Sequence, residues 1–143
     1  MNKTQRTKIR TAFAALASLN IPATMRGINR AIILATGHAP GSEGDVDWAA
    51  LARTGQPVVV YMGLTNIGAI AGALMAGGMP GQTPAAIIQS ATTSEERILV
   101  ATASSIAKRA HEAGFASPAL IVFGDIVSVR NDLQPRRNLV ERG

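Results

Sequence analysis

Short apolar runs, bounded by glycine, proline or polar residues, alternate along this chain with segments of helical periodicity. Runs rich in Val, Ile, Leu and Ala are typical of strands buried on both faces of a sheet. Such strands, alternating with helical segments, predict an α/β domain in which helices cover a sheet. The predicted strands span residues 31–35, 58–61, 84–89, 97–102 and 119–123, and residues 126–129 are expected to prolong the last one.

Three further helices are predicted around these strands. An alanine-rich helix over residues 11–20 must stop before Pro22, because the residue before a proline avoids helical dihedral angles. A short helix follows Asp45 and Asp47, either of which can serve as its N-cap. An amphipathic helix over residues 104–113 completes the set.

The stretch from Pro57 to Pro80 organises the rest of the chain. It reads as a strand (58–61), a glycine-containing turn and a helix whose apolar residues fall on one stripe. Thr65 or Asn66 is expected to cap that helix. A strand, a turn and a helix N-terminus together form a ledge at the carboxyl end of the strand, where α/β sheets bind ligands.

Particular residues make this ledge more specific. Six blocks occur in order and with compatible gaps, and together they resemble the tetrapyrrole methylases, most of all the C-terminal half of the uroporphyrinogen-III C-methyltransferases. The resemblance covers residues 12–133 and implies a mixed, roughly five-stranded sheet layered with helices. The blocks are LNIPATMRG (19–27), ILATGH (33–38), DVDWAALAR (45–53), VVVYMGL (58–64), TPAAIIQSATT (83–93) and PALIVFGDIVSVR (118–130).

The resemblance implies a binding site for S-adenosylmethionine, the methyl donor of this family. It assigns cofactor contacts to Tyr61 and Met62 in the YMG turn, and backbone contacts to Ala91, Ala119 and Leu120. Without the resemblance, the alternative is a core methionine at Met62 and ordinary strand-end residues at the other positions.

On the substrate side, the resemblance suggests Arg26 and the turn formed by Thr36, Gly37 and His38. Uroporphyrinogen carries several carboxylates, which an arginine fork can bind bidentately. The alternatives are a solvated loop cation at Arg26 and a hydrogen-bonded turn residue at His38. The family usually has a histidine where Met25 stands, so one imidazole is missing. With no cysteine in the chain, no metal site is expected.

Several family motifs do not occur in this sequence: the GxGxGD loop, the GGDPF-type stretch and the PGVTS-type turn. In the family they complete the cofactor cleft, and the acid/base residues lie in the same half. We therefore expect no catalytic residue here, weak cofactor binding and no turnover by the chain alone. The alternative is a non-catalytic dimerisation or split-subunit module, as a homodimer or with a partner that carries the other half.

Length and charge fit one soluble, cytoplasmic domain. The chain has 143 residues and a net charge of +5, but residues 11–129 hold six bases and seven acids. The excess belongs to a basic leader (1–10), expected to be unstructured, and a basic tail (134–143). A nucleic-acid binder is a third hypothesis, which the absence of interleaved aromatic residues disfavours. The first 20 residues superficially resemble a signal peptide, but the favoured interpretation is that AALASLNIP (14–22) already belongs to the folded domain. No segment has the apolar length of a membrane span.

Overall fold

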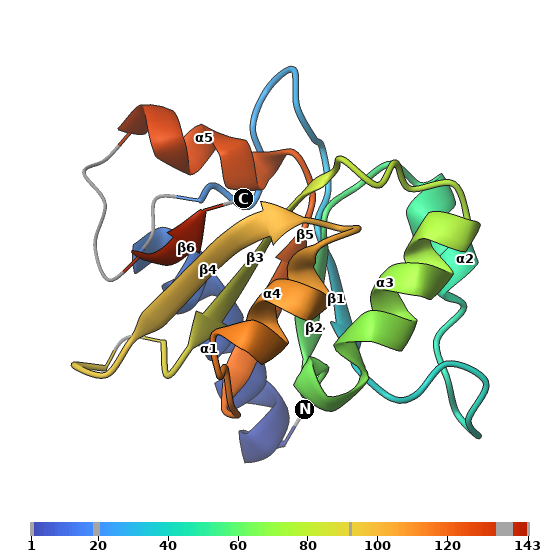
Figure 1. Cartoon of the computed structure of the whole chain (residues 1–143), viewed down its shortest axis with the longest axis horizontal. Helices are drawn as coiled ribbons and strands as arrows, with labels where there is room; N and C mark the ends of the chain where they lie inside the picture. Colours follow the sequence, from blue (N-terminus) through green and yellow to red (C-terminus); the bar gives the residue numbers. More distant parts are fainter. Residues whose placement is uncertain (1, 19–20, 92, 134–138, 143) are drawn as a thin grey trace.

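Six strands form one mixed sheet in the computed structural model, which describes residues 2–18, 21–91, 93–133 and 139–142 (Figure 1). Their order across the sheet is β1-β2-β5-β3-β4-β6. The pairs β1–β2 and β4–β6 are parallel, and the other three pairs are antiparallel. The strands are β1 (Ile33–Thr36), β2 (Val58–Tyr61), β3 (Pro84–Gln89), β4 (Arg97–Thr102), β5 (Ala119–Phe123) and β6 (Leu139–Arg142).

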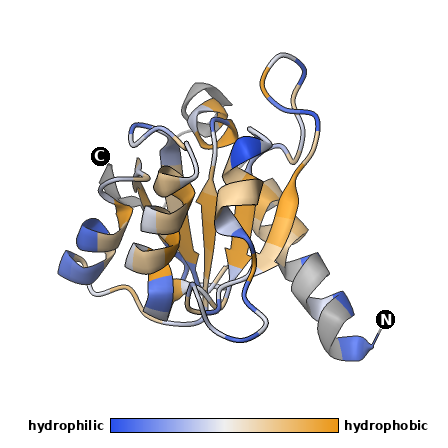
Figure 2. Ribbon diagram, turned by 90° about the vertical axis from the view of Figure 1, so that its right-hand side faces the viewer, coloured by the Kyte–Doolittle hydropathy of each residue, from blue (hydrophilic) through white to orange (hydrophobic). Residues whose placement is uncertain are grey.

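Helices lie on both faces of this sheet, and Figure 2 shows the apolar strands between them. One face packs against α2, α3 and α4, and the other packs against α1 and α5. The helical elements are α1 (Lys3–Ser18), α2 (Trp48–Arg53), the 3₁₀ turn η1 (Leu64–Asn66), α3 (Ile67–Ala76), α4 (Ile106–Glu112) and α5 (Ile126–Leu133).

The alternation of side chains along the strands produces these two faces. In β2, Val58 and Val60 join the core under α2, α3 and α4, whereas Val59 joins the core under α1 and α5. All three side chains are fully buried. This two-sided burial confirms the expected α/β sheet layered with helices.

Strand direction decides which loops meet. Because β3 runs parallel to β2, the ends of β1, β2 and β3 lie at the same edge of the sheet as the starts of β4 and β5. We call this edge, which lies low in Figure 1, the site edge. The expected ligand ledge after β2 is therefore flanked by the β3–β4 loop and the α4–β5 loop.

Three expectations about the ends of the chain differ from the structure. Residues 3–10, expected as an unstructured leader, form the first half of α1. Residues 139–142 of the expected tail pair with β4 and add a sixth strand to the expected five. Residues 126–129 begin helix α5 instead of prolonging β5, because Gly124 adopts φ +151° and turns the chain away from the sheet.

Candidate functional site

A cleft of about 830 Å³ opens at the site edge. Residues from three loops line it: the turn after β2, the β3–β4 loop and the α4–β5 loop. All five positions expected to contact a cofactor are among the lining residues, namely Tyr61, Met62, Ala91, Ala119 and Leu120. They come from segments up to 59 positions apart in the sequence, and the sheet topology brings them together.

Met62 presents its side chain to this cleft and to solvent. It is 57% exposed, so the alternative of a core methionine is wrong. Its backbone has φ +52°, a left-handed conformation that is uncommon for a residue with a side chain and costs on the order of 1 kcal/mol. Functional sites are where such conformations concentrate.

Backbone groups at the cleft remain open to a ligand. No hydrogen bond joins Met62 or Ala91 to another described residue. By contrast, Ser90 N–H donates to the Pro118 carbonyl at 2.9 Å and ties the β3–β4 loop to the start of β5. Main-chain groups can therefore form hydrogen bonds with a ligand here. Such a site requires small residues, which let the ligand approach the backbone, and no particular side chain.

The turn of Thr36, Gly37 and His38 lies directly beside the cleft. Gly37 N–H donates to the Tyr61 carbonyl at 2.7 Å, and Asn66 Nδ2 donates to the Gly37 carbonyl at 3.0 Å. Asn66 thus binds the neighbouring turn, and its side chain makes no capping bond to α3, contrary to expectation. The two turns approach so closely that a Cβ on Gly37 would lie 2.2 Å from Cα of Gly63.

Arg26 lies at the opposite edge of the sheet. Its loop precedes β1 and is held by Asn29, whose Nδ2 donates to the Ala23 and Ala31 carbonyls at 2.7 and 2.9 Å. The loop also contacts the residues before β2, because Gln56 Oε1 accepts the Ala31 N–H at 3.2 Å. The structure therefore separates Arg26 from the other three residues expected on the substrate side.

Several lining residues were missed in the sequence. Ser90, Thr93 and Glu95 come from the β3–β4 loop, and the signal in the sequence that could have located them is the tendency of Ser and Thr to form local turns. Thr93 Oγ1 donates to the Ser90 carbonyl at 2.7 Å and accepts the Glu95 N–H at 3.2 Å. That turn fixes the loop at the mouth of the cleft and brings one carboxylate, that of Glu95, to its lining.

Tyr61 occupies the junction between cleft and sheet. It pairs with Leu120 of β5 and Thr36 of β1, and burial raises the pKa of its phenol above the ordinary value of 10.0. The hydroxyl is therefore neutral at physiological pH. Among the described residues, no three His, Cys, Asp or Glu side chains come together as metal ligands.

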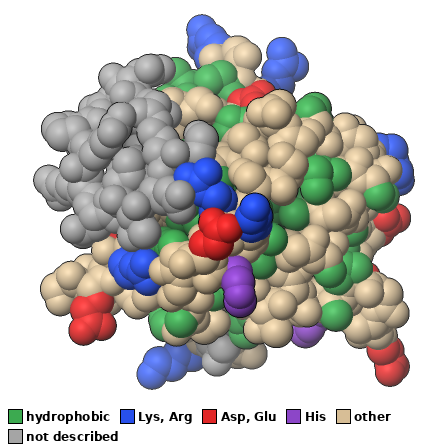
Figure 3. Space-filling model, in the orientation of Figure 1, with side chains coloured by type: hydrophobic (Ala, Val, Ile, Leu, Met, Phe, Trp, Pro, Cys, Tyr) green, Lys and Arg blue, Asp and Glu red, His purple; other side chains and the backbone are tan. Residues whose placement is uncertain are grey.

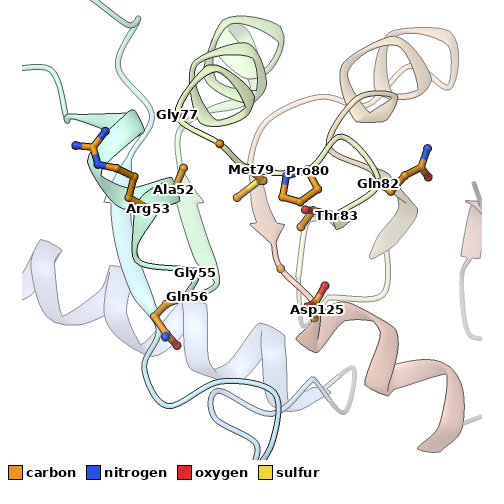
Figure 4. Close-up of a pocket in the computed structure, with 12 residues that line it drawn as sticks. Ala52, Arg53, Gly55, Gln56, Gly77, Met79, Pro80, Gln82, Thr83 and Asp125 are labelled. Atoms are coloured by element: carbon orange, nitrogen blue, oxygen red, sulfur yellow. The ribbon is translucent and has the colours of Figure 1, made fainter.

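A second cavity, of about 600 Å³, lies at the opposite edge of the sheet (Figure 4). It is bounded by the α2–β2 loop, the α3–β3 loop and the turn after β5. Arg53 and Asp125 stand on opposite sides of it, and Figure 4 shows the Arg53 side chain extending outward. The backbone N–H groups of Gly77, Gly78 and Thr83 are already bonded within the chain, so these three are not open to a ligand.

Comparison with known families gives one match over most of the chain. The family model described as Tetrapyrrole (Corrin/Porphyrin) Methylases matches residues 9–107. This span contains two of the three loops that line the cleft, and it ends before β5. In the part of the chain that the structure describes, no helix combines the length and apolar character needed to cross a bilayer.

Curated relatives carry the match further along the chain. The siroheme synthase of Nitrosospira multiformis is 37% identical over 134 residues, which are 92% of this chain and 28% of the relative. Siroheme synthase 2 of Serratia proteamaculans is 39% identical over 125 residues, 87% of this chain and 26% of the relative. The chain therefore spans about a quarter of the length of these relatives.

Solved structures match at the level of the fold. Uroporphyrin-III C-methyl transferase from Thermus thermophilus, complexed with S-adenyl homocysteine, has a TM-score of 0.67 and 29% identity, covering 81% of this chain and 51% of that chain. A cobalt precorrin-4 methyltransferase has a TM-score of 0.74 at 20% identity and covers 82% and 49%. The expectation of a C-terminal half is therefore partly wrong: the chain covers about half of these solved chains, but only about a quarter of the longer siroheme synthases.

Proposed function

Since this chain belongs to the tetrapyrrole (corrin/porphyrin) methylase family, we propose that it forms one wall of the S-adenosylmethionine cleft of a uroporphyrinogen-III C-methyltransferase that acts in siroheme or cobalamin synthesis. The observation that carries this proposal is the cleft at the site edge, which unites Tyr61, Met62, Ala91, Ala119 and Leu120.

The cleft fits the cofactor in size and in chemistry. Its volume of about 830 Å³ lies in the range of small-molecule sites. The open main-chain groups of Met62 and Ala91 suit the hydrogen-bonding edges of adenine and ribose, and the exposed thioether of Met62 supplies a soft apolar contact. When bound, the cofactor supplies a methyl group carried on a positively charged sulfur.

The turn of Thr36, Gly37 and His38 is the proposed contribution to the tetrapyrrole side. It is in hydrogen-bond contact with the strand end that carries Met62, so a substrate held there lies next to the cofactor. His38 is exposed and can donate to a substrate carboxylate. We leave Arg26 out of this site, because it lies at the other edge of the sheet.

We expect the isolated chain to bind S-adenosylhomocysteine weakly and to transfer no methyl group. Positioning and proton transfer require groups from a second wall, since the described residues that line the cleft include one carboxylate, that of Glu95, and no histidine. A titration with millimolar S-adenosylhomocysteine, followed by amide chemical shifts, should perturb residues around Met62, Ala91 and Ala119. A response confined to other residues would refute the assignment of the cleft, and tight binding by the chain alone would refute its incompleteness.

Substitution at Met62 tests the same wall. Met62→Ala removes an exposed side chain, so the free energy of unfolding should change by less than about 0.5 kcal/mol while the shift perturbations weaken several-fold. Met25→Ala is the matched control, because Met25 is also exposed (39%) but lies in the loop at the opposite edge. Equal effects of the two substitutions would argue against a cofactor contact at Met62.

A second candidate function is a non-catalytic module that a partner completes, either a second copy or a subunit with the other half. Such a partner would supply the part of the fold that the solved methyltransferase chains have beyond the half that this chain covers. Sedimentation of the chain alone distinguishes the cases, since a monomer at all concentrations contradicts the homodimer. A separately expressed N-terminal half of a relative should tighten S-adenosylhomocysteine binding if the split-subunit alternative holds.

A further inference from the structure

We propose that Gln89 and Arg97 are positioning residues that hold the α4–β5 loop, residues 113–118, as the third wall of the cleft. The inference rests on the proposed cofactor function and adds two residues that line no part of the cleft themselves. Its physical basis is a set of side-chain to main-chain bonds from the sheet to this loop.

The two side chains act from paired positions. Gln89 is the last residue of β3 and lies opposite Arg97, the first residue of β4, so both side chains project from the same face of the sheet. This face also carries α4, whose C-terminal end leads into the loop. Gln89 is additionally paired with Ala119, the first residue of β5.

Arg97 binds the start of the loop. Its Nη2 donates to the Ala113 carbonyl at 2.7 Å, and its Nη1 donates to the Gly114 carbonyl at 3.3 Å. The guanidinium lies 4.5 Å from the centre of the Phe115 ring, within cation–π range. Carbonyl groups at the end of a helix lack intrahelical partners, and a cation there is favourable.

Gln89 binds the middle of the loop, because its Oε1 accepts the Ala116 N–H at 2.7 Å. Ala116, Ser117 and Pro118 are exposed, so little packing fixes them. Ser117 and Pro118 nevertheless line the cleft, and the Pro118 carbonyl accepts the Ser90 N–H. Phe115 packs against the core, but the exposed residues 116–118 need such bonds to hold a wall in the geometry that a ligand requires.

Gln89→Met tests the role of the acceptor, since methionine has a similar length and no strong acceptor. Gln89→Glu should rescue it, because a carboxylate also accepts the Ala116 N–H. Gln82→Met is the matched control: it makes the same chemical change at an exposed residue at the opposite edge. Native-state hydrogen exchange of the Ala116 amide reports the anchor, and titration with S-adenosylhomocysteine reports the cleft.

In Gln89→Met, the Ala116 amide should exchange about three- to tenfold faster, and the affinity for S-adenosylhomocysteine should fall by a similar factor. This factor corresponds to the net free energy of one hydrogen bond. Gln89→Glu and Gln82→Met should match the wild type in both measurements. Unchanged exchange in Gln89→Met would overturn the anchor, and faster exchange with unchanged affinity would overturn its role in the cleft. If the wild type gives no response to the ligand while exchange still changes, the proposed function fails with this role, and the anchor remains structural.

Discussion

At the scale of single residues, the contact between Gly37 and Gly63 decides where the two turns of the site lie. A side chain on Gly37 would meet the Gly63 backbone, which cannot move aside like the end of a flexible side chain. The bond from Gly37 N–H to the Tyr61 carbonyl depends on this approach. The absence of a side chain at Gly37 is therefore a structural requirement of the site.

Gly37→Ala should lower the free energy of unfolding by about 1–3 kcal/mol, the usual cost of overpacking. Gly72→Ala is the control, because Gly72 lies in α3 with open space around its Cβ position. This control should stabilise the protein by about 0.5–1 kcal/mol through helix propensity. Urea unfolding, followed by the fluorescence of the single, buried Trp48, measures both changes. Equal stability of Gly37→Ala and the wild type would contradict the close approach.

Tyr61 gives a prediction that depends on pH. It is the only tyrosine, so phenolate absorbance reports it alone, and its midpoint in the folded protein should lie above 10.0. Because the unfolded chain loses this proton at a lower pH than the folded chain, the phenol stabilises the fold fully below pH 10 and loses that contribution as pH rises through the folded pKa. Tyr61→Phe should lack this loss of stability above pH 10. A folded midpoint at or below 10.0 would contradict burial of the phenol.

The residues expected to contact the cofactor lie together in one cleft, whereas those expected on the substrate side do not, and the difference has a physical reason. The YMG turn follows a strand whose burial can be read from its valines, and the end of a strand places the next residues at one edge of the sheet. Arg26 lies seven residues before β1, so no local sequence pattern indicated at which edge of the sheet its loop would lie. The anchoring bonds of Gln89 and Arg97 depend on the register in which β3 pairs with β4 and β5, and this register cannot be read from the sequence.

At the scale of elements, β2, β3, β4 and β5 coincide with their predicted ranges, because each is a bounded apolar run buried on both faces. Helix α5 was missed, since Ile126, Val127 and Val129 favour strands by intrinsic propensity. All three side chains are buried, and the packing of Ile126 and Val127 on the face of α1 outweighs that preference. The first half of α1 was missed because its polar residues give no apolar stripe.

The N-cap of α2 offers a test at this scale. The Asp47 side chain accepts the Ala50 N–H at 3.0 Å, and so provides an acceptor for one of the N–H groups that have no intrahelical partner at the start of a helix. Asp47→Ala should lower the free energy of unfolding by about 1 kcal/mol, and Asp47→Asn, which keeps an acceptor, by much less. Asp45→Asn is a separate probe, since Asp45 Oδ1 accepts the Trp48 indole N–H. If Asp47→Ala and Asp47→Asn were equally stable in urea, the cap would not contribute.

At the scale of the whole molecule, charges of both signs mix on one face, and bases gather in the first half of α1. On the face shown in Figure 3, basic and acidic side chains lie among one another, and the pair of Lys108 and Glu112 is 3.9 Å apart. Residues 3–10, which carry four bases, lie on helix α1. We expect any affinity for duplex DNA to be weak and to fall steeply with salt. Affinity for duplex DNA that barely changed with salt would rule out the hypothesis of binding through these basic residues.

The place of β5 in the sheet has a consequence for synthesis on the ribosome. This strand emerges last of the central five, yet it alone joins the pair β1–β2 to the pair β3–β4. A nascent polypeptide that ends before residue 119 thus has two separate strand pairs, β1–β2 and β3–β4, with no strand to join them. Each pair exposes unpaired backbone amides to other chains. Cooperative folding must wait until about residue 123 has left the exit tunnel, so translation pauses shortly before that point prolong the interval in which aggregation competes.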